Sequence, residues 1–255
     1  MSIKKYNILV EQAKRQFENQ DYLASYESFL KAFTIQVDVE DYLCFGFVCI
    51  ELDYLGRASD VFSGVLEQAS HYKAHLGKGR IYELLGQKED ALLSYEQAIA
   101  SNPAFASSYF SAAYLYDDLG NVAKAITYYE KTIALDDDHF WALLNLGSIY
   151  EQSQEDEKAL ALFNRAKSID SSKPMVHFNI GVIMGKKGDI DNAIEFYLKE
   201  LKTKNPTALT YYNLGLCYKV KKDYLKTRLA YLEGLKHDKE NYDLWYNLAC
   251  LYVLM

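Results

Sequence analysis

The chain has 255 residues, of which half are hydrophobic, so it is long enough to bury a substantial core. Its 35 acidic and 28 basic residues give a net charge of −7, which disfavours nucleic acid as a partner. Three prolines and thirteen glycines leave no room for a long flexible linker. No run of about twenty apolar residues predicts membrane insertion, and the N-terminus lacks an apolar signal core. We therefore expect a soluble, cytoplasmic protein.

The expected elements are helices, because apolar residues recur three and four positions apart along the chain. The helices come in pairs. Turns such as those at Gly86, Gly120 and Gly188 separate the two members of a pair, since glycine readily adopts the left-handed conformation that ends a helix. From the N-terminus, the pairs are expected over residues 6–38, 39–71, 72–105, 106–139, 140–173, 174–207 and 208–241, followed by a single helix over 242–255.

These pairs are copies of one unit. The most regular segment recurs at a step of 34 residues, over 143–150, 177–184, 211–218 and 245–252. In the other direction, steps of 34 and then 33 residues reach further copies at 109–116, 75–82, 42–49 and 9–16. A second signature follows in each pair, as in Ala91, Tyr95 and Ala98. One pair of this size cannot bury both its faces, so we expect neighbouring pairs to stack.

The two signatures resemble the tetratricopeptide repeat, in which a large residue precedes Leu-Gly and Tyr, and Ala…Phe/Tyr…Ala then leads to a proline such as Pro103. The resemblance covers essentially the whole chain and implies an all-α, right-handed superhelical solenoid of antiparallel helix pairs. It implies seven repeats and one extra helix in a single domain over 1–255. The first repeat departs from the pattern, with Gln12-Ala13 in place of Leu-Gly, and most repeat ends lack the proline. Proteins of this kind bind a protein or peptide on the concave face that their first helices line.

No pattern in the sequence predicts catalysis. His71 and His75 have the spacing of a zinc-binding pair, but His75 stands at a packing position and no nearby residue completes the ligand set. The four cysteines show no paired spacing and are expected to be reduced thiols. The nucleophile-elbow, P-loop and dinucleotide-binding motifs are missing from the sequence. We therefore expect no enzymatic activity, no metal and no cofactor.

One polar residue type recurs at a single position of the first helix. Asparagine is a poor helix former, yet it stands there in four consecutive repeats. Its amide offers both a donor and an acceptor, which match the C=O and N–H of a peptide backbone. Such a row resembles the asparagine ladders of peptide-binding superhelical repeats and would hold an extended peptide of any sequence. Alternatively, the amides cap or bridge adjacent helices without contacting a ligand. The row comprises Asn145, Asn179, Asn213 and Asn247.

Apolar residues flank the asparagine row on either side. Because the repeat signatures already supply the core, we expect these residues to be surplus to it and to anchor a partner. The anchors predicted to contact the peptide are Phe110, Tyr114, Trp141, Leu144, Phe178, Tyr212 and Tyr246.

Basic residues allow two further expectations. Chaperone-binding tetratricopeptide modules bind a C-terminal carboxylate with a set of Lys, Asn and Arg residues. Only Lys73 and Arg80 are basic candidates here, so such a clamp is not expected. Lysines also gather near the turns of the sixth and seventh repeats, at Lys186, Lys187 and Lys221 among others. They form either a solvated edge or a surface for an acidic partner or for head-to-tail association.

The last helix ends the pattern halfway through a repeat. We expect Trp245, Leu248, Ala249 and Tyr252 to pack on the seventh repeat, and Leu251, Val253, Leu254 and Met255 to lack cover. This indicates a fragment of a longer protein, or a homo-oligomer that forms through the C-terminal helix. The function favoured by the sequence is a non-catalytic scaffold that binds an extended peptide segment of a partner in its concave groove. The alternatives are a self-assembling structural protein and the targeting arm of a longer enzyme.

Overall fold

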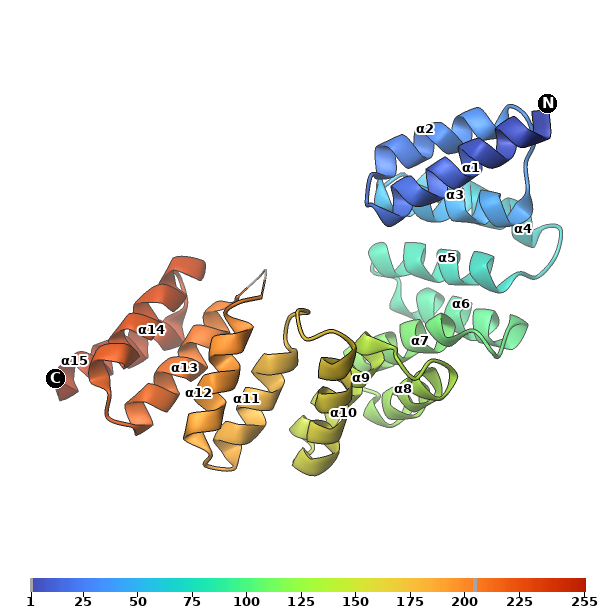
Figure 1. Ribbon diagram of the computed structural model, residues 1–255. Coiled ribbons are helices and arrows are strands. Elements are labelled where there is room, and N and C mark those ends of the chain that lie inside the picture. Colours follow the sequence, from blue (N-terminus) through green and yellow to red (C-terminus); the bar gives the residue numbers. More distant parts are fainter. Residues whose placement is uncertain (1, 204–205) are drawn as a thin grey trace. The chain divides into compact units, whose positions relative to one another are not determined.

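The computed structural model describes residues 2–203 and 206–255, and every regular element in these two ranges is an α-helix (Figure 1). The chain forms two compact units, residues 1–131 and 132–255, and the division falls within α8 (Val122–Leu135). None of the described helices is both long and apolar enough to cross a bilayer. Unit 1 contains α1 (Ser2–Glu18), α2 (Tyr22–Phe33), α3 (Val39–Glu51), α4 (Leu55–Leu66), α5 (Tyr72–Leu84), α6 (Lys88–Ser101) and α7 (Ala106–Asp118). Unit 2 contains α9 (Phe140–Gln152), α10 (Asp156–Ile169), α11 (Val176–Lys186), α12 (Ile190–Glu200), α13 (Ala208–Val220), α14 (Tyr224–His237) and α15 (Tyr242–Leu254).

Within each unit, helices pack in the order in which they occur along the chain. In unit 1, α1 packs on α2, α3 on α4 and α5 on α6, and each second helix also contacts the first helix of the next pair. The same arrangement holds in unit 2 from α9 to α14, and α15 packs on α14. The predicted all-α fold of tandem helix pairs is confirmed.

The turn inside each pair has a left-handed residue. Glycine provides it at Gly86, Gly120 and Gly188, with φ of 72°, 74° and 77°, as the sequence predicted. A residue with a side chain adopts the same conformation in other pairs, with φ between 59° and 63°. The left-handed conformation brings the side chain of a non-glycine residue close to the backbone, so these turns are strained. They are at Gln20, Asp53, Gln154 and Lys222.

The core forms where a small residue of the first helix meets an aromatic ring of the second. A Cβ atom on Gly79 would lie 2.3 Å from the ring of Tyr95, and one on Gly215 would lie 2.3 Å from the ring of Tyr231. Both tyrosines are fully buried. The glycine therefore allows the two helices to approach closely, and the ring fills the space that the missing side chain leaves.

Candidate functional site

The four members of the asparagine row lie on α9, α11, α13 and α15, at the same position of each first helix of unit 2, and all four side chains are half-buried. The Nδ2 atom of Asn179 donates a hydrogen bond to the Ser148 hydroxyl of the preceding first helix at 3.3 Å. The Nδ2 atom of Asn247 donates to the Asp243 carbonyl of its own helix at 2.9 Å. Within residues 2–203 and 206–255, the Asn213 amide forms no hydrogen bond with another residue.

These contacts leave hydrogen-bonding capacity in the row. An asparagine amide has two N–H donors and a carbonyl acceptor. The contact between Asn179 and Ser148 uses one donor and shows that bridging between helices, the alternative reading of the row, occurs at this position. It leaves the second donor and the acceptor of the Asn179 amide for another group.

The predicted apolar anchors divide into exposed, half-buried and buried residues. Trp141 and Tyr246 in unit 2 and Tyr114 in unit 1 are exposed, with fractions between 41% and 57%. Tyr212 is half-buried, with its ring centroid 6.3 Å from that of Tyr231 on the second helix of its pair. Phe110 is also half-buried.

Leu144 and Phe178 contradict the expectation of a surplus stripe. They are only 4% and 6% exposed, so they belong to the core. The Phe178 ring lies 5.8 Å from that of Tyr197, the second-helix aromatic of the same repeat. Their position in the first helix faces the second helix, and it therefore packs against the pair instead of lining an open surface.

Trp141 lies at the start of α9 and contacts a cation. Its ring is perpendicular to that of Phe140, with centroids 5.0 Å apart. The Lys173 ammonium lies 4.6 Å from the Phe140 centroid and 5.8 Å from that of Trp141, close enough for cation–π attraction to both rings. The indole therefore keeps an exposed surface while two neighbours hold it in place.

Three lysines near the turns of the sixth and seventh repeats form ion pairs within the chain. Lys187 pairs with Glu157 at 2.7 Å, and Lys221 forms an ion pair with Asp191. The second pair is the first one displaced by 34 residues at both partners, so it repeats with the fold. Lys186 likewise pairs with Glu151. The acidic partner proposed for these lysines is therefore not needed to neutralise them.

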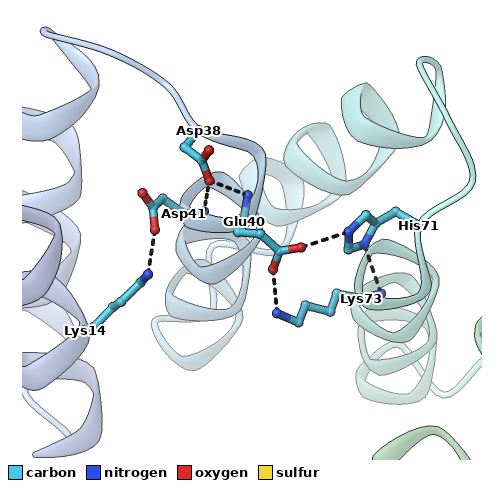
Figure 2. Close-up of polar contacts among 6 residues, drawn as sticks. All are labelled: Lys14, Asp38, Glu40, Asp41, His71 and Lys73. Carbon is cyan, nitrogen blue, oxygen red and sulfur yellow. Dashed lines mark hydrogen bonds and ion pairs between the residues drawn. The ribbon is translucent and has the colours of Figure 1, made fainter. Parts of the chain in front are cut away.

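A buried carboxylate connects the first two repeats of unit 1. Asp41 is 7% exposed and accepts a hydrogen bond from the Tyr6 hydroxyl at 2.6 Å. The Lys14 ammonium lies 2.6 Å from its other oxygen (Figure 2). Burial, together with the hydrogen bond to Asp41, raises the pKa of Tyr6, and the hydrogen bond with Asp41 raises the pKa of Lys14. Besides Lys73 and Arg80, Lys14 is thus a third basic candidate on the first helices of unit 1, and the sequence analysis did not predict it.

Glu40 connects the second repeat to the third. Its carboxylate lies 2.6 Å from the Lys73 ammonium and 3.1 Å from the Nε2 atom of His71 (Figure 2). The hydrogen bond from Lys73 lowers the pKa of Glu40, with a smaller contribution from His71. The Nδ1 atom of His71 accepts a hydrogen bond from the Lys73 backbone N–H at 3.3 Å and so caps α5. His71 therefore has a structural role, and the described residues include no group of three or more side chains placed to bind a metal.

The C-terminal helix buries a narrow stripe. Leu244, Leu248 and Leu251 are at most 3% exposed against the preceding repeat. The expectation that Leu251 lacks cover is therefore wrong, because it lies one helical turn from Leu248 on the same face. Trp245 and Tyr252, which were expected to pack on the seventh repeat, are 53% and 52% exposed, and Ala249 is exposed too. The exposed side also carries Val253, Leu254 and Met255, as expected.

Comparisons with known proteins identify the repeat. A family profile described as tetratricopeptide repeat matches residues 110–174, and a second profile with the same description matches residues 72–105 and 176–204. No curated protein sequence matches the chain.

Solved structures share the fold at low sequence identity. The APC/C hetero-tetramer Cut9–Hcn1 gives a TM-score of 0.71 at 19% identity over 96% of this chain and 49% of that chain, so this chain spans about half its length. The pilF protein of Pseudomonas aeruginosa gives 0.75 at 15% identity, over 83% and 96% of the two chains. YrrB, described as a TPR protein with an unusual peptide-binding site, gives 0.62 at 17% identity, over 74% and 98%. At these identities the likeness concerns the fold alone.

Proposed function

Because the chain belongs to the tetratricopeptide repeat family, we propose that it is a non-catalytic scaffold that holds an extended segment of a partner protein in a groove along α9, α11, α13 and α15. The observation that carries this proposal is the asparagine row, in which four half-buried amides recur at one position of successive first helices. In a helix this residue type lowers stability, so its recurrence needs a reason outside helix formation.

A peptide backbone has the groups that such amides pair with. Each asparagine can donate to a peptide C=O and accept from a peptide N–H, whatever the side chains of the peptide are. Asn213 supports this role, because the chain itself does not use its amide in the described residues. Trp141 is an exposed aromatic residue on α9 and would pack against a side chain of the bound segment.

The likeness to YrrB supports a peptide ligand, since that protein is described as having a peptide-binding site. It does not transfer any residue to this chain. The residues proposed here follow from the positions of the asparagines and from the exposure of the aromatic side chains.

The test is a selection of short unstructured peptides displayed on phage against the wild-type chain. The affinities of selected peptides are then measured for wild type, for the double variant Asn179→Ala/Asn213→Ala, and for Asn164→Ala, an exposed asparagine on α10 that serves as the matched control. We expect the double variant to lose about 1–3 kcal/mol of binding free energy, because backbone groups of the peptide lose their partners. Its melting temperature should stay level or rise slightly, since alanine favours the helix. Equal affinities for all three proteins would refute the groove.

A second candidate function is self-association through α15. The exposed side of this helix carries Trp245, Tyr252 and Val253, the last of them 87% exposed, and exposed apolar patches of this kind mark interaction sites. Light scattering on the wild type and on Tyr252→Glu/Val253→Glu distinguishes the two functions. Dimers that the double variant abolishes would favour self-association, whereas a monomeric wild type at high concentration would exclude it.

A further inference from the structure

A cleft of about 390 Å³ opens on unit 1, within the range of small-ligand sites. Its apolar lining comes from Phe17 of α1, Phe29 of α2, and Cys44 and Phe47 of α3. Cys44 stands in the second repeat at the position that asparagine occupies in the fifth, sixth and seventh repeats and in the final helix. The cleft, which we call the aromatic cleft, is therefore formed on the first-helix face, at the opposite end of the sequence from the asparagine row.

The three phenyl rings of the cleft are held in place by other aromatic rings. Phe47 packs on Phe62 with centroids 5.2 Å apart, and Phe17 packs on Tyr22 at 5.6 Å. Phe29 is fully buried. A cleft whose walls are fixed before binding loses little conformational entropy when an apolar group enters it.

Three charged side chains complete the lining, two of them basic. Lys14 of α1 and Arg80 of α5 are exposed, as is Glu18. The Nη2 atom of Arg80 donates to Glu51 at 3.2 Å, and this uses one of the five N–H groups of the guanidinium. Lys14 lies 2.6 Å from Asp41, which uses one of its three N–H groups. Lys14 thus pairs with the buried Asp41 and Arg80 with Glu51, and the N–H groups that these pairs leave over can donate to a carboxylate outside the chain.

We propose that the aromatic cleft binds an aromatic side chain of a partner peptide in which an acidic residue stands next to the aromatic one. The ring would pack against Phe17 and Phe47, where aromatic contacts favour an edge-to-face or offset geometry. The neighbouring carboxylate would accept hydrogen bonds from Arg80 or Lys14. The cleft thus recognises side chains of the peptide, whereas the asparagine row recognises its backbone. The inference rests on the proposed function in that the ligand is again a peptide.

The test uses the fluorescein-labelled peptide Gly-Ser-Asp-Phe-Asp-Ser-Gly and the full chain, with fluorescence anisotropy as the readout. Two comparison peptides carry alanine in place of the phenylalanine, or lysines in place of the aspartates. We expect each comparison peptide to bind at least about tenfold more weakly than the first. Equal binding of the alanine peptide, or no binding of the first peptide at about 1 mM chain, would overturn the inference.

Variants locate the binding site. Cys44→Phe fills the cleft, and Arg80→Gln removes one cation, so each should weaken binding at least about tenfold. Arg165→Gln, on α10 of unit 2, is the matched charge control and should bind as the wild type does. If Asn179→Ala/Asn213→Ala loses the peptide while Cys44→Phe retains it, the aromatic cleft is refuted and the asparagine groove stands.

Protection of Cys44 gives a readout that does not depend on the folding of any variant. Burial raises the pKa of the Cys44 thiol, so N-ethylmaleimide should modify it slowly and at mildly alkaline pH. The bound peptide should slow modification of Cys44, measured by mass spectrometry, while leaving unchanged the rate at Cys250, a half-buried cysteine of α15. Equal rates at Cys44 with and without a saturating peptide would contradict binding in the cleft.

Discussion

The Glu200 carboxylate, at the end of α12, accepts a hydrogen bond from the backbone N–H of Met175 at 2.7 Å. Its other oxygen accepts from the N–H of Phe178 at 3.1 Å. Met175 precedes α11 with a left-handed φ of 74° and provides no side-chain cap. Glu200 is 2% exposed and therefore caps α11 from within the core.

Replacing Glu200 with alanine should lower the free energy of unfolding by about 2–4 kcal/mol, because two buried N–H groups lose their acceptor. Glu200→Gln keeps one acceptor oxygen and should lose less. Glu195→Ala, which removes an exposed ion pair with Lys199, serves as the control and should change stability by less than about 1 kcal/mol. Urea denaturation monitored by circular dichroism measures all three. A loss for Glu200→Ala no larger than for Glu195→Ala would mean that the cap contributes nothing.

The strained turns predict a stabilising substitution. Gln154 has a φ of 63°, a conformation that costs a residue with a side chain about 1–2 kcal/mol and costs glycine almost nothing. Gln154→Gly should therefore raise the free energy of unfolding by about 0.5–1 kcal/mol, after the larger entropy of glycine in the unfolded chain is subtracted. Gly120→Ala, at the equivalent turn of the preceding repeat, should have the opposite sign in thermal unfolding.

The exposed fraction of an aromatic residue predicts whether its replacement lowers stability or weakens peptide binding. Phe163 is fully buried beneath Gly147, so Phe163→Ala should cost about 3–5 kcal/mol of stability. Trp141 is 41% exposed, and Trp141→Ala should cost about 1 kcal/mol while weakening any peptide that binds the asparagine row. If calorimetry finds Trp141→Ala to be the more destabilising of the two, the indole belongs to the core.

The ion pair of Glu40 and Lys73 predicts a dependence of stability on pH. The hydrogen bond from Lys73 lowers the pKa of Glu40 from 4.5, so its contribution is present above that value and disappears as pH falls through the lowered pKa. Glu40 raises the pKa of Lys73, so the same contribution persists at alkaline pH until Lys73 loses its proton. Lys73→Met should therefore melt below the wild type at neutral pH, and the difference should shrink as pH falls below 4.5 through the lowered pKa of Glu40. A difference that stays constant as pH falls through this range would assign the effect to packing of the lysine stem.

The fold could be predicted from the sequence because the repeat period is a global signal. The recurrence every 34 residues places a small residue opposite an aromatic one in every regular pair, as Gly215 and Tyr231 show. Three of the left-handed turn residues were also predicted, since glycine marks them. The turn at Gln154 was missed, because the stacking of the repeats imposes its conformation against its own preference.

The candidate site could be predicted only in part. Spacing places Leu144 and Asn145 next to each other on the first helix. Leu144 is buried in the core and Asn145 is half-buried, and spacing in the sequence does not predict how deeply each side chain is buried. The aromatic cleft was missed because its lining comes from three repeats whose residues share no motif. The role of Glu200 could have been predicted from the sequence, since a carboxylate stands at the position where other repeats have Ala98, Ala166 or Gly234.

The ion pair that recurs after 34 residues has a consequence for the addition of further repeats to the chain. Lys187 of the sixth repeat forms an ion pair with Glu157 of the preceding repeat. Asp191 of the sixth repeat forms an ion pair with Lys221 of the following repeat. The sixth repeat therefore carries both complementary halves of the pair. If the segment 174–207 were duplicated in tandem, Asp191 of the first copy would meet Lys187 of the second. A gene duplication of this segment would thus lengthen the protein by one repeat without leaving either charge unmatched, and it would add one more asparagine to the row.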